Sequence, residues 1–164
     1  MRLYHGSNLP VEEPRLIAQQ RGLDFGEGFY LTTNEAQAQR FSEIVVNRRK
    51  SGFSTVSVYE FEMETAEKTL SIRKFGNADA KWLKFVAANR LKSYTNEAYD
   101  VVIGAVANDK VMPTIQAFLG GFLNEEATLI TLKSSRLVDQ VCLKSEKALS
   151  LLHFIESYEV KEDR

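Results

Sequence analysis

The sequence contains little of what builds disulfide bonds or metal centres. Cys142 is the single cysteine among 164 residues, so an intramolecular disulfide bond and a cysteine-based metal cluster are both excluded. His5 and His153 are the only histidines, which is too few for a zinc site with the usual ligand spacing. We therefore expect no metal site in this protein.

Neither sign of charge prevails, and long hydrophobic runs are absent. The 21 basic and 22 acidic residues give a formal net charge of -1, which offers no reason to expect a nucleic-acid or anionic-membrane partner. No apolar run approaches the ~20 residues of a membrane span. The N-terminus also lacks the charged segment and the apolar segment of a signal peptide. We therefore expect a cytoplasmic protein with no membrane partner and no clear nucleic-acid surface.

Nothing in the sequence divides the chain into parts. The three prolines and nine glycines form no linker, and we find no repeat and no low-complexity tract. A chain of this length can bury a hydrophobic core by itself, and the hydrophobic fraction of 44% is that of an ordinary globular protein. We therefore expect a single domain over residues 1–164.

The pattern of apolar residues predicts more strands than helices. The predicted strands are residues 2–6, 28–33, 54–64, 69–75, 99–107, 139–145 and 156–160. The predicted helices are residues 34–50, 78–92, 110–121 and 146–155, the last of which places His153 on an apolar face. Residues 8–23 are predicted as a loop, and residues 125–133 suit either a helix or a strand. Because strands and helices do not alternate regularly, the pattern favours an α+β fold over a doubly wound one.

Glycines flank an aromatic stretch in GEGFYLTT, residues 26–33. A phosphate-binding glycine loop follows a strand and precedes a helix, so that backbone N–H groups converge on the phosphates. Here a strand follows instead, and no Lys-Ser/Thr pair ends the run. The Rossmann and Walker interpretations therefore fail. The glycines either allow a close approach of the backbone to a ligand or shape the bend into the strand.

His5 and Tyr30 have ordinary structural interpretations when each is considered alone. A histidine beside a glycine is commonly a surface or hydrogen-bonded structural residue, and a strand tyrosine is commonly half-buried packing. A Ser/His/Asp hydrolase is conceivable because Ser7 lies near His5, but no Gly-x-Ser-x-Gly elbow occurs. The order and the spacing of the two stretches carry more information than either residue.

Together, YHGS (residues 4–7) and FGEGFYLTTNEAQAQRF (residues 25–41) resemble the first two motifs of the ADP-ribosyltransferase superfamily. The similarity is to the branch shared by diphtheria-type toxins and poly(ADP-ribose) polymerases. The chain also resembles, over nearly its whole length, a bacterial protein family with YHGS, DFGxGFYLT and YDxVIGxVA landmarks. The resemblance implies an α+β fold of the ADP-ribosyltransferase-like split β-sandwich type, with two antiparallel or mixed sheets and flanking helices.

The resemblance implies that NAD is the substrate, and it assigns a role to each motif residue. His5 would bond to a ribose hydroxyl of NAD, and Gly6 would offer its backbone N–H and C=O to the nicotinamide carboxamide. Ser7 completes the first motif. Tyr30 would stack on the nicotinamide ring, and Phe41 in the following helix would cover the other face of the ring.

The third motif of the superfamily departs from its pattern in this chain. The family places a glutamate at the start of a late strand, where its charge stabilises an oxocarbenium-like transition state. The counterpart in DQVCL is Gln140, which accepts a hydrogen bond but carries no charge. Ala38 stands where the family has a carboxamide-binding hydroxyl. Glu27 and Asp24 are candidate substitutes for the glutamate, although a solvated surface charge is the more ordinary interpretation of each.

Asp139 is a poorer substitute for the missing glutamate. It directly precedes Gln140, and neighbouring side chains of a strand point to opposite faces of the sheet. We therefore expect the carboxylate of Asp139 to point away from the face that Gln140 occupies.

The resemblance implies a mono-ADP-ribosyltransferase with His5, Tyr30 and Gln140 as catalytic residues. It would cleave the nicotinamide–ribose bond and transfer ADP-ribose to an unknown macromolecular acceptor, as the toxin of a bacterial toxin–antitoxin or conflict system with an antitoxin protein as partner. The alternative is a weak or inactive module of the same fold that binds NAD, another nucleotide or a protein. RNA 2′-phosphotransfer ranks last, because only scattered arginines lie near the motifs, namely Arg2, Arg15 and Arg21.

Overall fold

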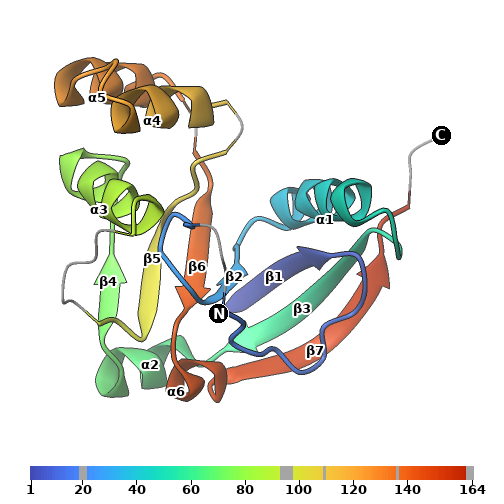
Figure 1. Cartoon of the computed structure of the whole chain (residues 1–164). Coiled ribbons are helices and arrows are strands. Elements are labelled where there is room, and N and C mark those ends of the chain that lie inside the picture. The colour runs from blue at the N-terminus through green and yellow to red at the C-terminus, as the bar shows by residue number, and fades with distance from the viewer. Residues whose placement is uncertain (19–21, 93–97, 109, 136, 162–164) are drawn as a thin grey trace.

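The fold contains two separate β-sheets with helices packed beside each (Figure 1). A computed structural model of the chain describes residues 1–18, 22–92, 98–108, 110–135 and 137–161. This architecture confirms the predicted α+β class. No helix in these ranges has the length and the apolar character needed to cross a bilayer.

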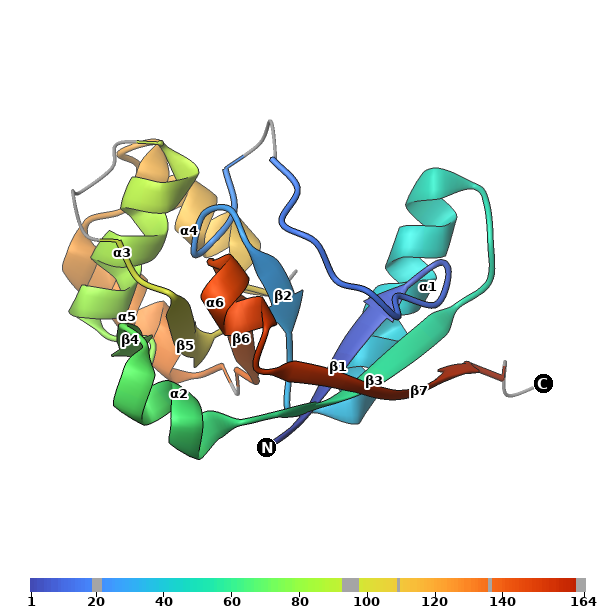
Figure 2. The same ribbon diagram turned by 90° about the horizontal axis from the view of Figure 1, so that it is seen from below.

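The first sheet has three antiparallel strands in the order β1-β3-β7. They are β1 (Arg2–Ser7), β3 (Thr55–Phe61) and β7 (Leu152–Glu159). Helix α1 (Glu35–Arg49) lies beside this sheet (Figures 1 and 2). Ala38 of α1 packs with Val56 and Val58 of the central strand in a small core cluster. The helix begins where predicted, because the side chain of Asn34 accepts the N–H of Gln37.

The second sheet has four strands in the order β2-β6-β5-β4, with β4 and β5 parallel and the other pairs antiparallel. They are β2 (Phe29–Leu31), β4 (Ile72–Lys74), β5 (Val101–Ala105) and β6 (Asp139–Leu143). Three helices lie beside it, as Figure 2 shows, namely α3 (Ala80–Arg90), α4 (Met112–Leu119) and α5 (Glu125–Lys133). Their buried side chains, among them Trp82 and Ile115, pack against Val102 and Cys142 of the sheet.

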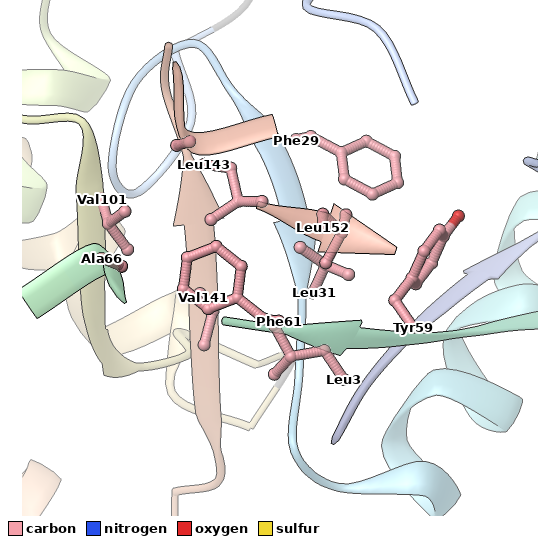
Figure 3. Packing of buried hydrophobic residues seen from close by; sticks show 11 residues of the cluster. Leu3, Phe29, Leu31, Tyr59, Phe61, Ala66, Val101, Val141, Leu143 and Leu152 are labelled. Atoms are coloured by element: carbon pink, nitrogen blue, oxygen red, sulfur yellow. The ribbon is translucent and has the colours of Figure 1, made fainter. Parts of the chain in front are cut away.

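The main core joins the facing sides of the two sheets (Figure 3). Leu3, Tyr59 and Phe61 come from the three-stranded sheet, and Phe29 and Val141 come from the four-stranded sheet. Two short helices contribute a buried alanine each, namely α2 (Met63–Thr69) and α6 (Glu146–Leu149). Burial of these large apolar side chains, at about 25 cal/mol per Å², holds the sheets together.

Within the described residues, a backbone bridge between Tyr4 and Thr32 joins the two sheets. The N–H of Tyr4 donates to the carbonyl of Thr32 at 2.9 Å, and the N–H of Thr32 donates to the carbonyl of Tyr4 at 3.0 Å. This antiparallel bridge links the outer edge of β1 to the residue that follows β2. The first two sequence motifs therefore converge at this junction between the sheets.

The predicted helix over residues 146–155 is confirmed for its first four residues and wrong for the rest. Helix α6 ends at Leu149, and β7 begins at Leu152. Pairing with β3 decides this conformation, because it buries Leu152 while His153 alternates to the exposed face. The imidazole Nε2 of His153 lies 2.6 Å from Glu62 Oε1 at the surface, so this histidine does not lie on an apolar helical face.

Two further differences concern the ends of elements. The predicted strand over residues 54–64 is too long, since β3 ends at Phe61 and α2 begins at Met63. The ambiguous segment 125–133 is a helix, capped by Asn124, whose side chain accepts the N–H of Ala127. The described residues of the predicted loop 8–23 contain neither helix nor strand, while residues 19–21 lie outside the described ranges.

Candidate functional site

His5 lies on β1 at the junction and bonds to the second motif. Its Nδ1 lies 2.8 Å from the carbonyl oxygen of Tyr30. A carbonyl can only accept, so Nδ1 must carry the proton, and Nε2 of the neutral ring is a hydrogen-bond acceptor. Burial lowers the pKa of His5, and the charge of Arg49 lowers it further, against the raising effect of the bond to Tyr30. The imidazole, 4.5 Å from the ring centroid of Phe29, is therefore neutral near pH 7.

Gly6 directs its peptide groups toward the same junction. Alternate residues of a strand direct their N–H and C=O groups to the same edge, and Tyr4 uses that edge to bond to Thr32. Gly6 is two residues after Tyr4, so continuing the antiparallel bridge would place it opposite Tyr30. The backbone N–H and C=O of Gly6 therefore face the region between the two strands.

The other side of Gly6 is closed by α1. A Cβ atom built on Gly6 would lie 2.0 Å from the carbonyl oxygen of Ala38 and 2.9 Å from the backbone nitrogen of Ser42. Ala38 is buried, and it packs with Val56 and Val58 of β3. Phe41 precedes Ser42 on the helix and is 43% exposed. Ser7 is buried at the end of β1, opposite Thr55 of β3.

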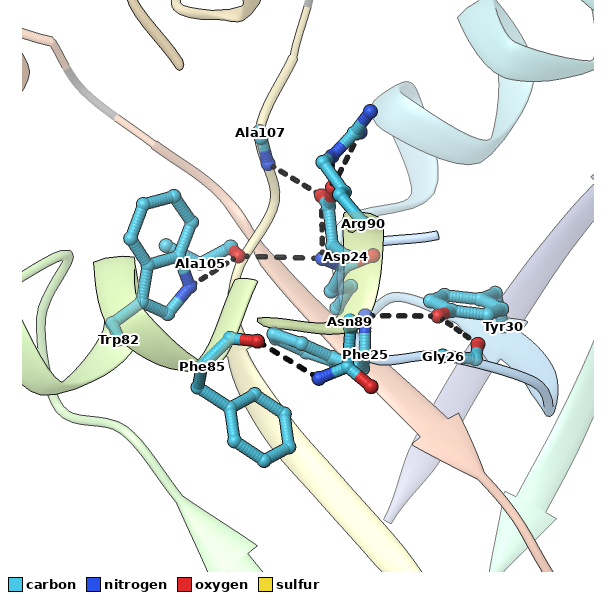
Figure 4. A network of polar contacts seen from close by, with 11 residues as sticks. Asp24, Phe25, Gly26, Tyr30, Trp82, Phe85, Asn89, Arg90, Ala105 and Ala107 are labelled. Carbon is cyan, nitrogen blue, oxygen red and sulfur yellow. Dashed lines mark hydrogen bonds and ion pairs between the residues drawn. The ribbon is translucent and has the colours of Figure 1, made fainter. Parts of the chain in front are cut away.

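The phenol of Tyr30 is anchored to the glycine-rich loop (Figure 4). Its hydroxyl donates to the carbonyl of Gly26 at 2.6 Å and accepts the N–H of Phe25 at 3.1 Å. Burial raises the pKa of Tyr30, so the hydroxyl stays protonated. Tyr30 pairs with Cys142 across β2 and β6, and its ring packs with the helix-covered side of the four-stranded sheet.

The glycines of this loop serve the bend into β2. Gly26 has φ of +78°, a left-handed conformation that favours glycine. A Cβ on Gly28 would lie 2.4 Å from the Sγ of Cys142, so that residue lets the loop approach β6. Lys144 Nζ donates to the carbonyls of Phe25 and Glu27 at 2.5 and 2.9 Å. The sequence left two explanations for these glycines, a close approach to a ligand or the bend into the strand. The described contacts support the bend.

Gln140 is buried on β6, with 6% of its surface exposed. Its Nε2 donates to Asp24 Oδ2 at 3.2 Å and to the carbonyl of Ala105 at 3.3 Å. Gln140 lies two residues before Cys142, which pairs with Tyr30. Because side chains two apart in a strand share a face, Gln140 and Tyr30 lie on the same face of the four-stranded sheet.

Asp24 is not the solvated charge expected from the sequence. It is 6% exposed, and its Oδ1 lies 2.6 Å from Arg90 Nε and 2.5 Å from Arg90 Nη2. Its Oδ2 accepts the N–H of Ala107 at 3.1 Å in addition to the amide of Gln140. The guanidinium balances its charge, because burial of an unpaired carboxylate would be costly. Figure 4 shows this network beside the loop that holds Tyr30.

The remaining acidic candidates take separate positions. Glu27 is exposed in the loop. Asp139 accepts the hydroxyl of Thr33 at 2.8 Å and the N–H of Thr33 at 3.2 Å, which ties the start of β6 to the end of β2. Its carboxylate thus bonds to Thr33, whereas the side chain of Gln140 bonds to Asp24.

Four of the predicted site residues, His5, Gly6, Tyr30 and Gln140, lie around this junction. Their side chains do not share one face of the four-stranded sheet, because the imidazole of His5 packs against Phe29, which alternates with Tyr30 on β2. A cavity of about 320 Å³ lies elsewhere, beyond the end of β1, and Asn8, Phe53 and Tyr158 are among its lining residues. None of those four junction residues lines this cavity.

Sequence reasoning missed the partners of Asp24. Arg90 and Ala107 lie 66 and 83 residues away along the chain. No local spacing can reveal such contacts, because they depend on how α3 and the end of β5 pack against the loop.

The fold and this junction define an α+β protein in which two sequence motifs meet between separate sheets. Residues 1–154 match the family described as "Protein of unknown function (DUF3990)", and the chain belongs to that family. No curated protein and no solved structure matches the chain.

Proposed function

We propose that this chain is a NAD-dependent mono-ADP-ribosyltransferase with the split β-sandwich of that superfamily. The bond between the imidazole of His5 and the carbonyl of Tyr30 is the observation that carries the proposal. It joins the first motif to the second where the two sheets meet, and it leaves Nε2 of His5 as an acceptor for a ribose hydroxyl. Two separate sheets with flanking helices also suit this fold.

The groups around the junction complement the nicotinamide half of NAD. A carboxamide donates through its NH₂ and accepts through its oxygen, and the edge of Gly6 that faces the junction offers one C=O and one N–H. The ring of Tyr30 and the exposed ring of Phe41 would enclose the pyridinium. A cation against an aromatic face gains up to about 2 kcal/mol when water is excluded. Ser7 would act by completing the strand end that presents His5 and Gly6.

The reaction breaks the bond between the nicotinamide nitrogen and C1′ of the ribose. The bonding electron pair leaves with nicotinamide, which becomes neutral, while positive charge develops on the ribose. A nucleophile of the macromolecular acceptor then bonds to C1′ and loses its proton. Gln140 would accept a hydrogen bond from a ribose hydroxyl and so orient the sugar during this step.

The site supplies little negative charge for the transition state. Gln140 is neutral, and the carboxylate of Asp24 is already paired with Arg90. Electrostatic stabilisation of the developing cation is therefore weak. We expect slow transfer of single ADP-ribose units rather than polymer synthesis, which suits the toxin of a bacterial toxin–antitoxin or conflict system with an antitoxin protein as partner.

The same observations support a second candidate, a module that binds NAD, another nucleotide or a protein without turnover. The neutral Gln140 and the buried Ala38 motivate it. The two candidates agree on NAD binding at the junction when NAD is the ligand, and they differ on the release of nicotinamide.

One experiment with labelled NAD separates them. Purified protein is incubated with NAD and a cell lysate, and label transfer, nicotinamide release and thermal stabilisation by NAD are measured. We expect NAD to stabilise the wild type by mass action and the exposed control His153→Ala equally, but not His5→Ala. Transfer or release supports the enzyme, and stabilisation without either supports the module. Absence of stabilisation in the wild type would remove both NAD proposals.

A further inference from the structure

The amide of Gln140 is held in one orientation by its two partners. Both Asp24 Oδ2, at 3.2 Å, and the carbonyl of Ala105, at 3.3 Å, are hydrogen-bond acceptors. The NH₂ end of the amide must therefore face them, since the oxygen end could donate nothing. The oxygen Oε1 is consequently turned away from Asp24 and Ala105.

Asp24 is itself fixed by its other contacts. Its Oδ1 accepts the Nε–H of Arg90 and forms an ion pair with Nη2, and its Oδ2 accepts the N–H of Ala107. Both oxygens are therefore occupied, and the carboxylate cannot turn without breaking charge-assisted bonds. Because Arg90 ends α3 and Ala107 follows β5, two distant parts of the chain hold Asp24 against Gln140.

We propose that Asp24 is a positioning residue that selects an amide at position 140 and turns the amide oxygen toward the ligand. The selection of an amide follows from the contacts alone. The identity of the ligand, a ribose hydroxyl of a dinucleotide, depends on the proposed function. A glutamate at this position would meet the same two acceptors, Asp24 Oδ2 and the carbonyl of Ala105, with its own acceptor oxygens. The glutamine is thus matched to Asp24, and the two residues form one unit.

A cycle of four proteins tests the selection: the wild type, Asp24→Asn, Gln140→Glu and the double variant. In Gln140→Glu, burial and the charge of Asp24 raise the pKa of the new carboxyl above its unfolded value of about 4.3. An acid whose folded pKa is raised loses stability as the pH rises through the interval between the two values. The unfolding constant of Gln140→Glu, relative to the wild type, should therefore grow by at least about tenfold between pH 5 and pH 8.

The double variant supplies the rescue. Asp24→Asn removes the negative charge that opposes the carboxylate introduced by Gln140→Glu and leaves the guanidinium of Arg90 without a carboxylate of its own, so most of the added pH dependence should disappear. Gln140→Met is the control, because it has similar size and no charge and should show no added pH dependence. Urea unfolding at pH 5 and pH 8 gives the constants. The selection would be overturned if the two substitutions changed the free energy of unfolding additively, or if Gln140→Glu showed equal pH dependence with and without Asp24→Asn. If Gln140→Glu is already unfolded at pH 8, additivity is judged from the unfolding data at pH 5.

Calorimetric titration with NAD tests the orientation of the amide oxygen. Asp24→Asn and Gln140→Met should each weaken NAD binding about tenfold, the value of one hydrogen bond. Combining them should cost no more than either alone, because Asp24 acts through Gln140. Unchanged binding by Asp24→Asn would overturn the positioning role. If the wild type binds no NAD, the proposed function is wrong, and so is the inference that the amide oxygen faces NAD. The unfolding measurements would still test whether Asp24 selects an amide at position 140.

Discussion

The Cβ position of Gly6 lies 2.0 Å from the carbonyl oxygen of Ala38. This contact fixes the distance between β1 and α1, and it explains why a glycine follows His5 whether or not a ligand binds. An ordinary Cβ contact needs about twice that separation from a backbone atom. Since the obstacle is backbone, the helix itself would have to move to admit any side chain.

We expect Gly6→Ala to destabilise the fold by at least about 2 kcal/mol, the range of overpacking in a core. The matched control is Gly76→Ala, because a Cβ on Gly76 meets nothing within 4 Å. Its change in the free energy of unfolding should stay within about 0.5 kcal/mol. Urea unfolding of both variants measures the difference. Equal stability of Gly6→Ala and Gly76→Ala would mean that α1 and β1 are not in the contact described.

The lowered pKa of His5 makes a prediction about pH. A base whose folded pKa lies below its unfolded value binds fewer protons when folded, so stability is lost as the pH falls. The loss should begin near pH 6.5, the unfolded value, and end once the pH lies below the folded pKa. It reflects the cost of charging a ring that burial and Arg49 keep neutral.

Two measurements check this behaviour of His5. NMR titration of the imidazole resonances should give a pKa below 6.5. Urea unfolding between pH 7.5 and pH 5, in a His153→Gln background that removes the surface histidine, should show the loss of stability, and His5→Asn should reduce it. A midpoint for His5 at or above that of an unfolded chain would contradict the partly buried, Nδ1-protonated ring.

Most helices and strands with a regular apolar period could be predicted from the sequence. The prediction was wrong where pairing with a distant strand determines the conformation of a segment. The segment from Lys147 to Phe154 has leucines at helical spacing, but it also alternates from Leu152 onward. Pairing with β3 selects the alternating pattern, as the exposed His153 between the buried Leu152 and the partly buried Phe154 demonstrates. Local periodicity cannot choose between two patterns that overlap by a few residues.

The candidate site could likewise be predicted only in part from the sequence. Motif order predicted that His5 and Tyr30 belong together, and the bond between them joins residues 25 apart. The orientation of the tyrosine ring toward Gly26 was not predicted, nor was the burial of Asp24. Both depend on the packing of α3 against the loop, and a charged residue in a polar stretch gives no local sign that a distant arginine will cover it.

The ion pair between Asp24 and Arg90 should contribute more to stability than an exposed pair on the same helix. Arg90→Met leaves a buried carboxylate without a counter-charge, which costs about 3 kcal/mol or more. The control is Lys84→Met, because Lys84 bonds to Glu125 at 3.3 Å between exposed side chains, and such pairs contribute at most about 1 kcal/mol. Urea unfolding at neutral pH and low salt measures both changes.

A second substitution distinguishes loss of the charge pair from loss of packing by the arginine stem. In Arg90→Met combined with Asp24→Asn, the uncompensated charge is gone, so part of the stability lost in Arg90→Met should return. Loss of packing alone would give no recovery, because the stem of Arg90 is absent from both proteins. If Arg90→Met costs no more than Lys84→Met, the carboxylate of Asp24 is not buried as described, and its hold on Gln140 fails with it.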